Sequence, residues 1–176
     1  MNTVSRTLIA AAAGMALLGL SACSGNGSGE PTGNPTAPPE EKAIASFDPC
    51  TFFPAEELSS LGVSTQSEDG SVVQSEPGCE WQGEKMTLTL LKNASQTVES
   101  YETSGNWDSY SKKSIGGRSG AVAVESGATG QGGCTVLVNA GGGVAVYGVD
   151  GAMRDSVDAC GEAEKVANQT ASRLPE

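Results

Sequence analysis

Residues 134–149 read CTVLVNAGGGVAVYGV, and this stretch decides the fold of the chain. Two runs rich in strand-forming residues, 134–138 and 144–149, stand on either side of three glycines that begin at Gly141. Glycine adopts the backbone angles that a tight turn requires, so such runs joined by glycines are typical of a β-hairpin. We therefore predict two antiparallel strands here.

Strand patterns continue from this hairpin toward the N-terminus. Met86, Leu88 and Leu90 alternate with threonines, which predicts a strand with one buried face and one polar face. Turn-forming residues at 82–85 separate this strand from the run before it. Further strands are expected at residues 79–81 and 121–124, with an irregular strand around Val72 and Val73 and an ambiguous segment at 106–111.

Helical patterns occur at both ends of the domain and in its middle. Asp48 suits a helix N-cap, Pro49 suits the first helical position, and Gly62 suits a helix C-terminus. Because strands and helices do not alternate regularly, we predict the α+β class, in which helices pack on an antiparallel sheet. Helical turns are expected at residues 48–53, 54–61, 97–104 and 156–173.

The N-terminal residues predict export. Arg6 precedes an apolar run at Leu8–Leu20, which has the length of a signal peptide and is too short to span a bilayer. The run ends in Leu20-Ser21-Ala22-Cys23, a match to the lipobox of bacterial lipoproteins. We predict that residues 1–22 are a lipoprotein signal peptide and that diacylglycerol and a fatty acid such as palmitate attach at Cys23. An ordinary secretory signal with an incidental cysteine is the alternative.

Composition predicts how the rest of the chain is attached. Residues 23–45 are rich in Pro, Gly and Ser, so a flexible, disordered tether is expected there, followed by a globular extracytoplasmic domain at 46–176. The formal net charge of −11 argues against nucleic acid as a partner and offers no basic surface to a membrane. The lipid on Cys23 is therefore the expected attachment to the outer face of the cell membrane.

The remaining cysteines predict disulfides. An even number of cysteines in an exported domain is typical of disulfide pairing, and the absence of histidine and of a CxxC motif argues against zinc. We favour the local pairing, Cys50 with Cys79 and Cys134 with Cys160, because each bond joins the start of a helix to the start of a strand. The main rival pairs Cys50 with Cys160 and Cys79 with Cys134.

Several short motifs in a fixed order resemble a known family. With the lipobox, they are similar to the actinobacterial lipoproteins grouped as Domain of Unknown Function 3558, and the resemblance covers residues 46–175. It implies an envelope location, paired cysteines and structural roles for the residues of the first two motifs, with no established activity and no catalytic residues. The motifs are Asp48-Pro49-Cys50, Cys79-Glu80-Trp81, Cys134-Thr135-Val136, Asp158-Ala159-Cys160 and Leu174-Pro175.

No group of residues predicts catalysis or metal binding. The chain has no histidine, which is the most common general base and metal ligand. Ser111-Lys112-Lys113-Ser114 is interpreted as a solvated, loop-like run rather than a Ser-Lys catalytic pair. Glu80 and Glu125 are the carboxylates to examine for acid–base chemistry, although solvent-facing strand positions also explain them. No cofactor and no metal site are expected.

The leading hypothesis is a non-enzymatic binding or accessory module of the cell envelope. Trp81, Trp107 and Tyr110, together with Tyr147, are candidates to line a groove for a glycan or peptide, although core packing is favoured for them. The partner would be an envelope protein, a polymer or a small ligand. The alternative function is a hydrolase of envelope polymers that uses paired carboxylates. A lipid carrier would need a large apolar cavity.

Overall fold

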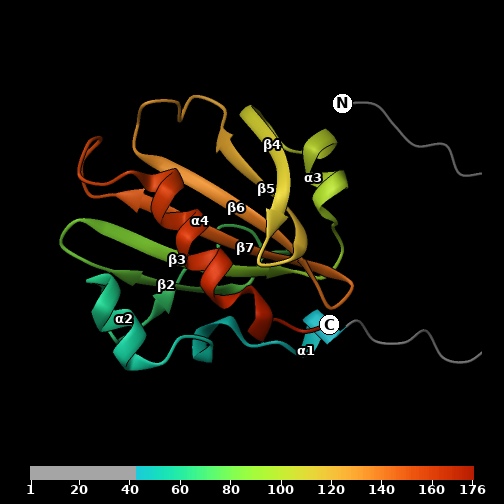
Figure 1. The fold of residues 1–176 in the computed structure, drawn as a ribbon, viewed down its shortest axis with the longest axis horizontal. Coiled ribbons are helices and arrows are strands. Elements are labelled where there is room, and N and C mark those ends of the chain that lie inside the picture. Colours follow the sequence, from blue (N-terminus) through green and yellow to red (C-terminus); the bar gives the residue numbers. More distant parts are fainter. Residues whose placement is uncertain (1–42) are drawn as a thin grey trace, which may run out of the picture. The chain divides into compact units, whose positions relative to one another are not determined.

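The computed structural model describes residues 43–176. In this part of the chain, seven antiparallel strands form one sheet in the order β1-β2-β3-β7-β6-β5-β4, with helices packed against it (Figure 1). The predicted α+β class, with an antiparallel sheet and two disulfides, is confirmed. None of the helices in residues 43–176 is long and apolar enough to cross a membrane.

The predicted hairpin lies at the centre of the sheet. It consists of β6 (Gly133–Ala140) and β7 (Gly143–Gly151). Gly141 and Gly142 form the turn with φ angles of 51° and 79°, which side chains other than glycine rarely adopt. On its other side β7 pairs with β3 (Met86–Asn93), so the last strand of the chain joins the two halves of the sheet.

The outer strands differ from the sequence prediction in two places. The ambiguous segment begins β4 (Trp107–Ile115), an edge strand paired with β5 (Arg118–Glu125), so the loop expected at 111–114 was wrong. Polar residues are tolerated there because one side of an edge strand faces water. The irregular strand around Val72 and Val73 was also wrong, since both belong to the exposed loop between β1 (Glu68–Asp69) and β2 (Gly78–Gln82).

The first cap is confirmed, whereas the last helix begins at Ala159, after the N-cap Asp158, and not at the expected residue 156. The carboxylate of Asp48 accepts a hydrogen bond from the backbone N–H of Cys50 at 3.0 Å, although a single 3-10 turn follows rather than a longer helix. Ile44 is fully buried, so the packed region begins before the expected boundary at residue 46. The elements are α1 (Ala43–Ser46), η1 (Pro49–Thr51), α2 (Ala55–Leu61), α3 (Val98–Ser104), α4 (Ala159–Thr170) and η2 (Ala171–Arg173).

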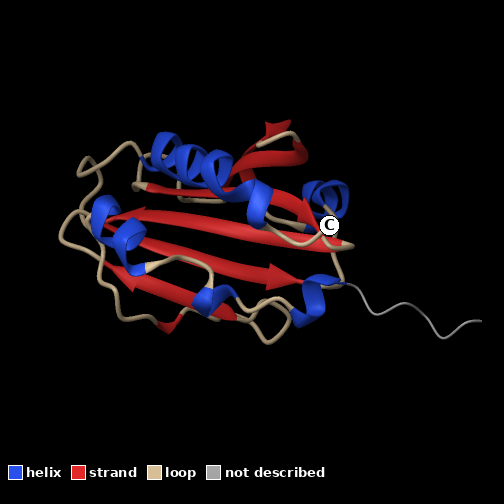
Figure 2. Ribbon diagram, turned by 60° about the horizontal axis from the view of Figure 1, so that its bottom comes forward, coloured by secondary structure: helices blue, strands red, loops and turns tan. Residues whose placement is uncertain are grey.

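Most helices cover one side of the sheet. We call this side, which carries Trp81, Leu88 and Tyr147, the helical face. Here α4 lies along β6 and β7, and α2 lies on the same side, nearer to β2 and β3 (Figure 2). The opposite side, which carries Leu137 and Val146, has only α3 packed on it, and we call it the open face. The main core therefore lies between the sheet and the helices of the helical face.

Both disulfides fasten the helical face. Cys50 of η1 is bonded to Cys79 of β2, and Cys134 of β6 is bonded to Cys160 of α4. This is the local pairing that the sequence favoured. Each bond ties a helical segment to the strand beneath it, so the layer that closes the core is covalently attached at two points.

Candidate ligand-binding cleft

The middle of the open face is hollowed into a cleft of about 290 Å³. Its floor is made by β3, β7 and β6, in which Thr89, Gly148 and Thr135 lie opposite one another. A Cβ atom at Gly148 would lie only 3.3 Å from the Cβ of Thr89, so the absence of a side chain at Gly148 leaves space in the cleft at this point. The next row along the same strands is apolar and consists of Leu91, Val146 and Leu137.

One wall of the cleft is the loop at 70–77. This loop carries Val72 and Val73, whose exposed fractions of 86% and 49% are unusual for large apolar side chains. Glu76 fastens the loop, because it accepts hydrogen bonds from the hydroxyl of Tyr101 and from Nδ2 of the buried Asn93. Burial and the contact with Glu76 raise the pKa of Tyr101 above its usual value, so this hydroxyl stays protonated and able to donate.

The other wall holds Trp107. Its Nε1 donates to the carbonyl oxygen of Tyr101 at 2.7 Å, and its ring centroid lies 5.7 Å from that of Tyr110. A Cβ atom at Gly105 would lie 2.0 Å from this Nε1, so glycine is required for the indole to fit. The ring is therefore held in one orientation and is only partly buried, which leaves it available to a ligand.

Four carboxylates line the cleft, and no lysine or arginine does. Asp150 lies close over β6, where a Cβ atom at Gly133 would be 2.6 Å from its Oδ1. The side chain of Asp150 is exposed at the surface, but the neighbouring strands remove part of its hydration. This desolvation is the main cause that raises the pKa of Asp150, and repulsion from Glu125 and Glu80 is the smaller cause. Among residues 43–176, the carboxylates of Asp150 and Glu125 have no hydrogen-bond or ion-pair partner. The other two carboxylates of the cleft belong to Glu76 and Glu80.

The structure brings three of the sequence candidates together. Glu80, Glu125 and Trp107 line the same cleft, and Tyr110 supports Trp107 from behind. Trp81 does not belong to the cleft: it is 1% exposed in the core of the helical face, so its candidacy for ligand binding was wrong. Tyr147 is likewise buried there, with its hydroxyl 2.9 Å from that of Thr170.

Sequence reasoning missed the acidic residue at the end of the hairpin. Asp150 follows Val144, Val146 and Gly148 at a spacing of two, so it shares a face with buried valines. A charge in phase with an apolar strand face was the available signal. The role of Glu76 had no comparable signal, because it depends on the path of an irregular loop.

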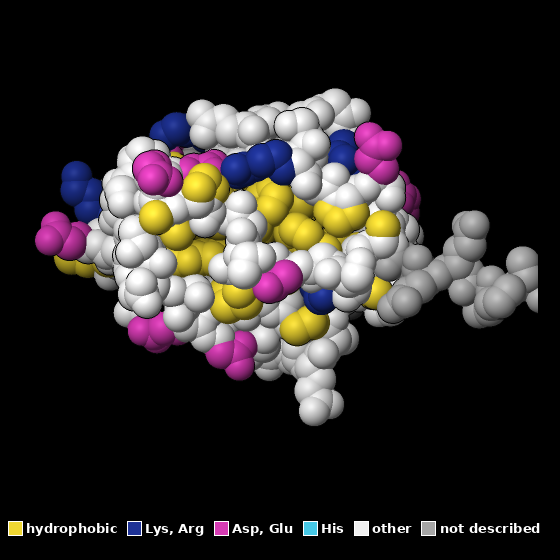
Figure 3. All heavy atoms as spheres, turned by 90° about the horizontal axis from the view of Figure 1, so that it is seen from below, with side chains coloured by type: hydrophobic (Ala, Val, Ile, Leu, Met, Phe, Trp, Pro, Cys, Tyr) yellow, Lys and Arg dark blue, Asp and Glu magenta, His cyan; other side chains and the backbone are white. Residues whose placement is uncertain are grey.

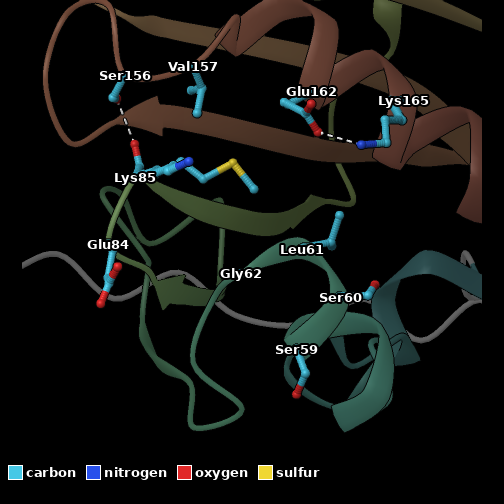
Figure 4. Close-up of a pocket in the computed structure, with 11 residues that line it drawn as sticks. Ser59, Ser60, Leu61, Gly62, Glu84, Lys85, Ser156, Val157, Glu162 and Lys165 are labelled. Atoms are coloured by element: carbon cyan, nitrogen blue, oxygen red, sulfur yellow. Dashed lines mark hydrogen bonds and ion pairs between the residues drawn. The ribbon is translucent and has the colours of Figure 1, made fainter.

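A larger hollow lies on the other side of the molecule, between the end of α2, the turn after β2 and the start of α4 (Figure 4). Its volume is about 740 Å³. Glu162 and Lys165 pair with each other at 2.9 Å, Ser156 donates to the carbonyl oxygen of Lys85, and Glu84 points away. Because these groups are already paired or do not converge, this hollow is the weaker candidate.

Apolar side chains also reach the surface on the side that carries α1 and α2, where charged groups interrupt them (Figure 3). Arg173 covers part of this surface, since its guanidinium lies 4.7 Å from the ring centre of Phe52 and it pairs with Glu57. Within residues 43–176, no group of three or more potential ligands could hold a metal ion. The cleft of the open face remains the best-formed candidate site.

Comparison with known proteins gives a family but no activity. Residues 18–173 match the family described as "Protein of unknown function (DUF3558)". No curated protein and no solved structure matches significantly. The matched region includes Cys23, both disulfides and every residue that lines the cleft.

Proposed function

This chain belongs to the DUF3558 family of proteins of unknown function, and from that premise we propose that it is a lipid-anchored binding module that works outside the cell membrane. The anchoring rests on the sequence: an apolar run, the lipobox ending at Cys23 and a polar tether before the domain. The matched region begins within the apolar run and so includes this cysteine, which supports the same interpretation.

The observation that carries the binding function is the cleft itself. Trp107 is held rigidly at its wall, and two carboxylates, Glu125 and Asp150, have no partner among the described residues. Carboxylates without a partner beside a partly exposed aromatic ring are suited to recognition, because a ligand can contact both. A concave surface that combines polar groups with apolar and aromatic side chains is typical of binding sites, and this cleft has both.

A photo-crosslinking amino acid placed in the cleft tests this function in intact cells. Position 73 at the rim is the test site, and position 169 on the exposed side of α4 is the control. We expect a discrete crosslinked product from position 73 only. Equal crosslinking from both positions, or none from the cleft, would refute the binding role of the open face.

The anchor is tested separately with Cys23→Ala. We expect this variant to leave the membrane fraction while its domain folds normally, because the acidic domain offers no basic surface to anionic lipids. Retention of Cys23→Ala in the membrane fraction would show that another feature supplies the attachment.

A hydrolase of envelope polymers is the second candidate function. One observation favours it: the raised pKa of Asp150 beside Glu125 and Glu80 resembles the environment of a general acid next to a second carboxylate. Purified cell walls incubated with the protein separate the two functions. Release of soluble fragments that is abolished by Asp150→Asn would favour the enzyme, whereas binding without release supports the module.

A further inference from the structure

We infer that the cleft of the open face takes an extended segment of a partner protein that carries lysine or arginine between apolar side chains. This inference rests on the proposed binding function and names its ligand. The first support is charge. Carboxylates of Glu76, Glu80, Glu125 and Asp150 line the cleft without a lysine or arginine among them, so a cationic group entering the cleft would relieve their mutual repulsion.

Most cations of residues 43–176 have partners outside the cleft. Lys112, Lys113 and Lys165 pair with glutamates of the helices, and the Nζ of Lys92 donates to the backbone of 45–47. The carboxylates of the cleft therefore have no lysine or arginine beside them in the lining. A cationic group of a partner would be attracted to them.

Apolar surface beside the carboxylates indicates more than a simple amine. Val72 and Val73 are exposed at the rim, while Leu137 and Val146 line the floor and are already buried. A ligand that buried the two exposed valines would need apolar side chains as well as charge. Trp107, backed by Tyr110, presents an aromatic ring to the cleft, and such rings attract lysine and arginine.

The shape of the surface favours an extended chain. A second hollow of about 410 Å³ shares Glu76, Tyr101, Trp107 and Glu125 with the cleft and continues past Gly105. A compact small molecule would fill one hollow, whereas an extended segment would occupy both and pass over Trp107. Alternating side chains of such a segment would contact the carboxylates and the apolar floor in turn.

Two occupants from the protein itself are disfavoured by charge. Residues 24–42 contain three glutamates and one lysine, and a second copy would bring the same net charge of −11. Neither complements an acidic cleft. A different protein with a basic segment does.

Binding of defined peptides to the full chain purified in detergent tests the inference. The probe is an eight-residue peptide of alternating lysine and valine, compared with a glutamate–valine peptide of equal length and with spermine. Of the two tryptophans in the sequence, Trp81 is buried, so a change in fluorescence on binding reports on Trp107. We expect binding of the lysine–valine peptide only, weakened by added salt.

Two matched double variants locate the site. Glu125→Gln with Asp150→Asn should weaken binding of the lysine–valine peptide by about tenfold, since one ion pair at a rim contributes up to about fivefold. Glu56→Gln with Glu84→Gln removes the same charge from other parts of the surface and should leave binding unchanged. Equal weakening by both variants would overturn the inference, because it would indicate non-specific attraction.

The remaining outcomes separate this inference from the proposed function. Spermine binding as tightly as the peptide would overturn the extended segment in favour of a small amine. If no cationic probe binds while crosslinking from position 73 persists, the ligand class is wrong and the binding module stands. If that crosslinking is also absent, the binding function itself is wrong.

Discussion

The two faces of the sheet are built from the same strands but differ in the environment of their polar and aromatic side chains. On the helical face, Trp81 and Tyr147 are buried beneath a layer that two disulfides fasten. On the open face, Asp150 and Glu125 project into a cleft without partners among the described residues. The helical face is therefore closed by a fastened layer, whereas the open face has a smaller apolar cluster beside carboxylates that a ligand could pair with.

The two tryptophans give the sharpest measure of this difference. Trp81→Ala should lower the free energy of unfolding by about 3–5 kcal/mol, because it opens a cavity in a closed core. Trp107→Ala should cost about 1–2 kcal/mol, since its ring is already partly in water. Urea unfolding followed by circular dichroism measures both. If Trp107→Ala cost as much as Trp81→Ala, the open face would be a second closed core rather than a binding surface.

Removal of the disulfide between Cys50 and Cys79 should have the next largest effect on the free energy of unfolding. Cys50 and Cys79 are separated by 29 residues, so replacing both with serine should lower the free energy of unfolding by up to about 3.5 kcal/mol in the chain-entropy model. Hydrogen exchange adds a spatial test. In the double serine variant, amide exchange should accelerate first in η1 and β2, while the amides of α3 on the open face keep their protection. Uniform acceleration would show that the two faces are not separately stabilised.

The sequence predicts the helical face better than the open face, and the reason is physical. Burial there follows the period of each element, so Leu88, Leu90 and the cap at Asp48 are recognisable from spacing alone. The local disulfide pairing follows for the same reason, because helix starts and strand starts can be located. These features depend on short stretches of chain.

The open face depends on contacts between distant segments. β4 has few apolar residues and exists because β5 supplies its hydrogen bonds, so its pattern resembles a loop. Val72 and Val73 have the composition of a strand, but the loop at 70–77 is held away from the ladder by Glu76 and its partners. Glu80 and Glu125 were recognisable as candidates, yet only the sheet register brings them to one cleft with Asp150.

The smallest expected effect concerns the pH dependence of stability. Folding raises the pKa of Asp150, so its charged form opposes folding at neutral pH. Asp150→Asn should therefore stabilise the protein at pH 7, by no more than about 1 kcal/mol because water screens a carboxylate at a rim. The gain should shrink as the pH falls through the raised pKa and vanish below about 3.9, the ordinary value for aspartate.

Asp108 provides the matched control, because its carboxylate is satisfied rather than unpaired. The side chain of Thr129 donates to it at 2.7 Å, and this bond, with others from nearby backbone N–H groups, lowers the pKa of Asp108. Asp108→Asn should therefore destabilise the protein at neutral pH, and this difference should be lost as the pH falls through the lowered pKa. Thermal unfolding between pH 2 and 7 measures both variants. Destabilisation by Asp150→Asn as well would mean that Asp150 serves the fold, and the contrast between the two faces would then fail at the residue on which it most depends.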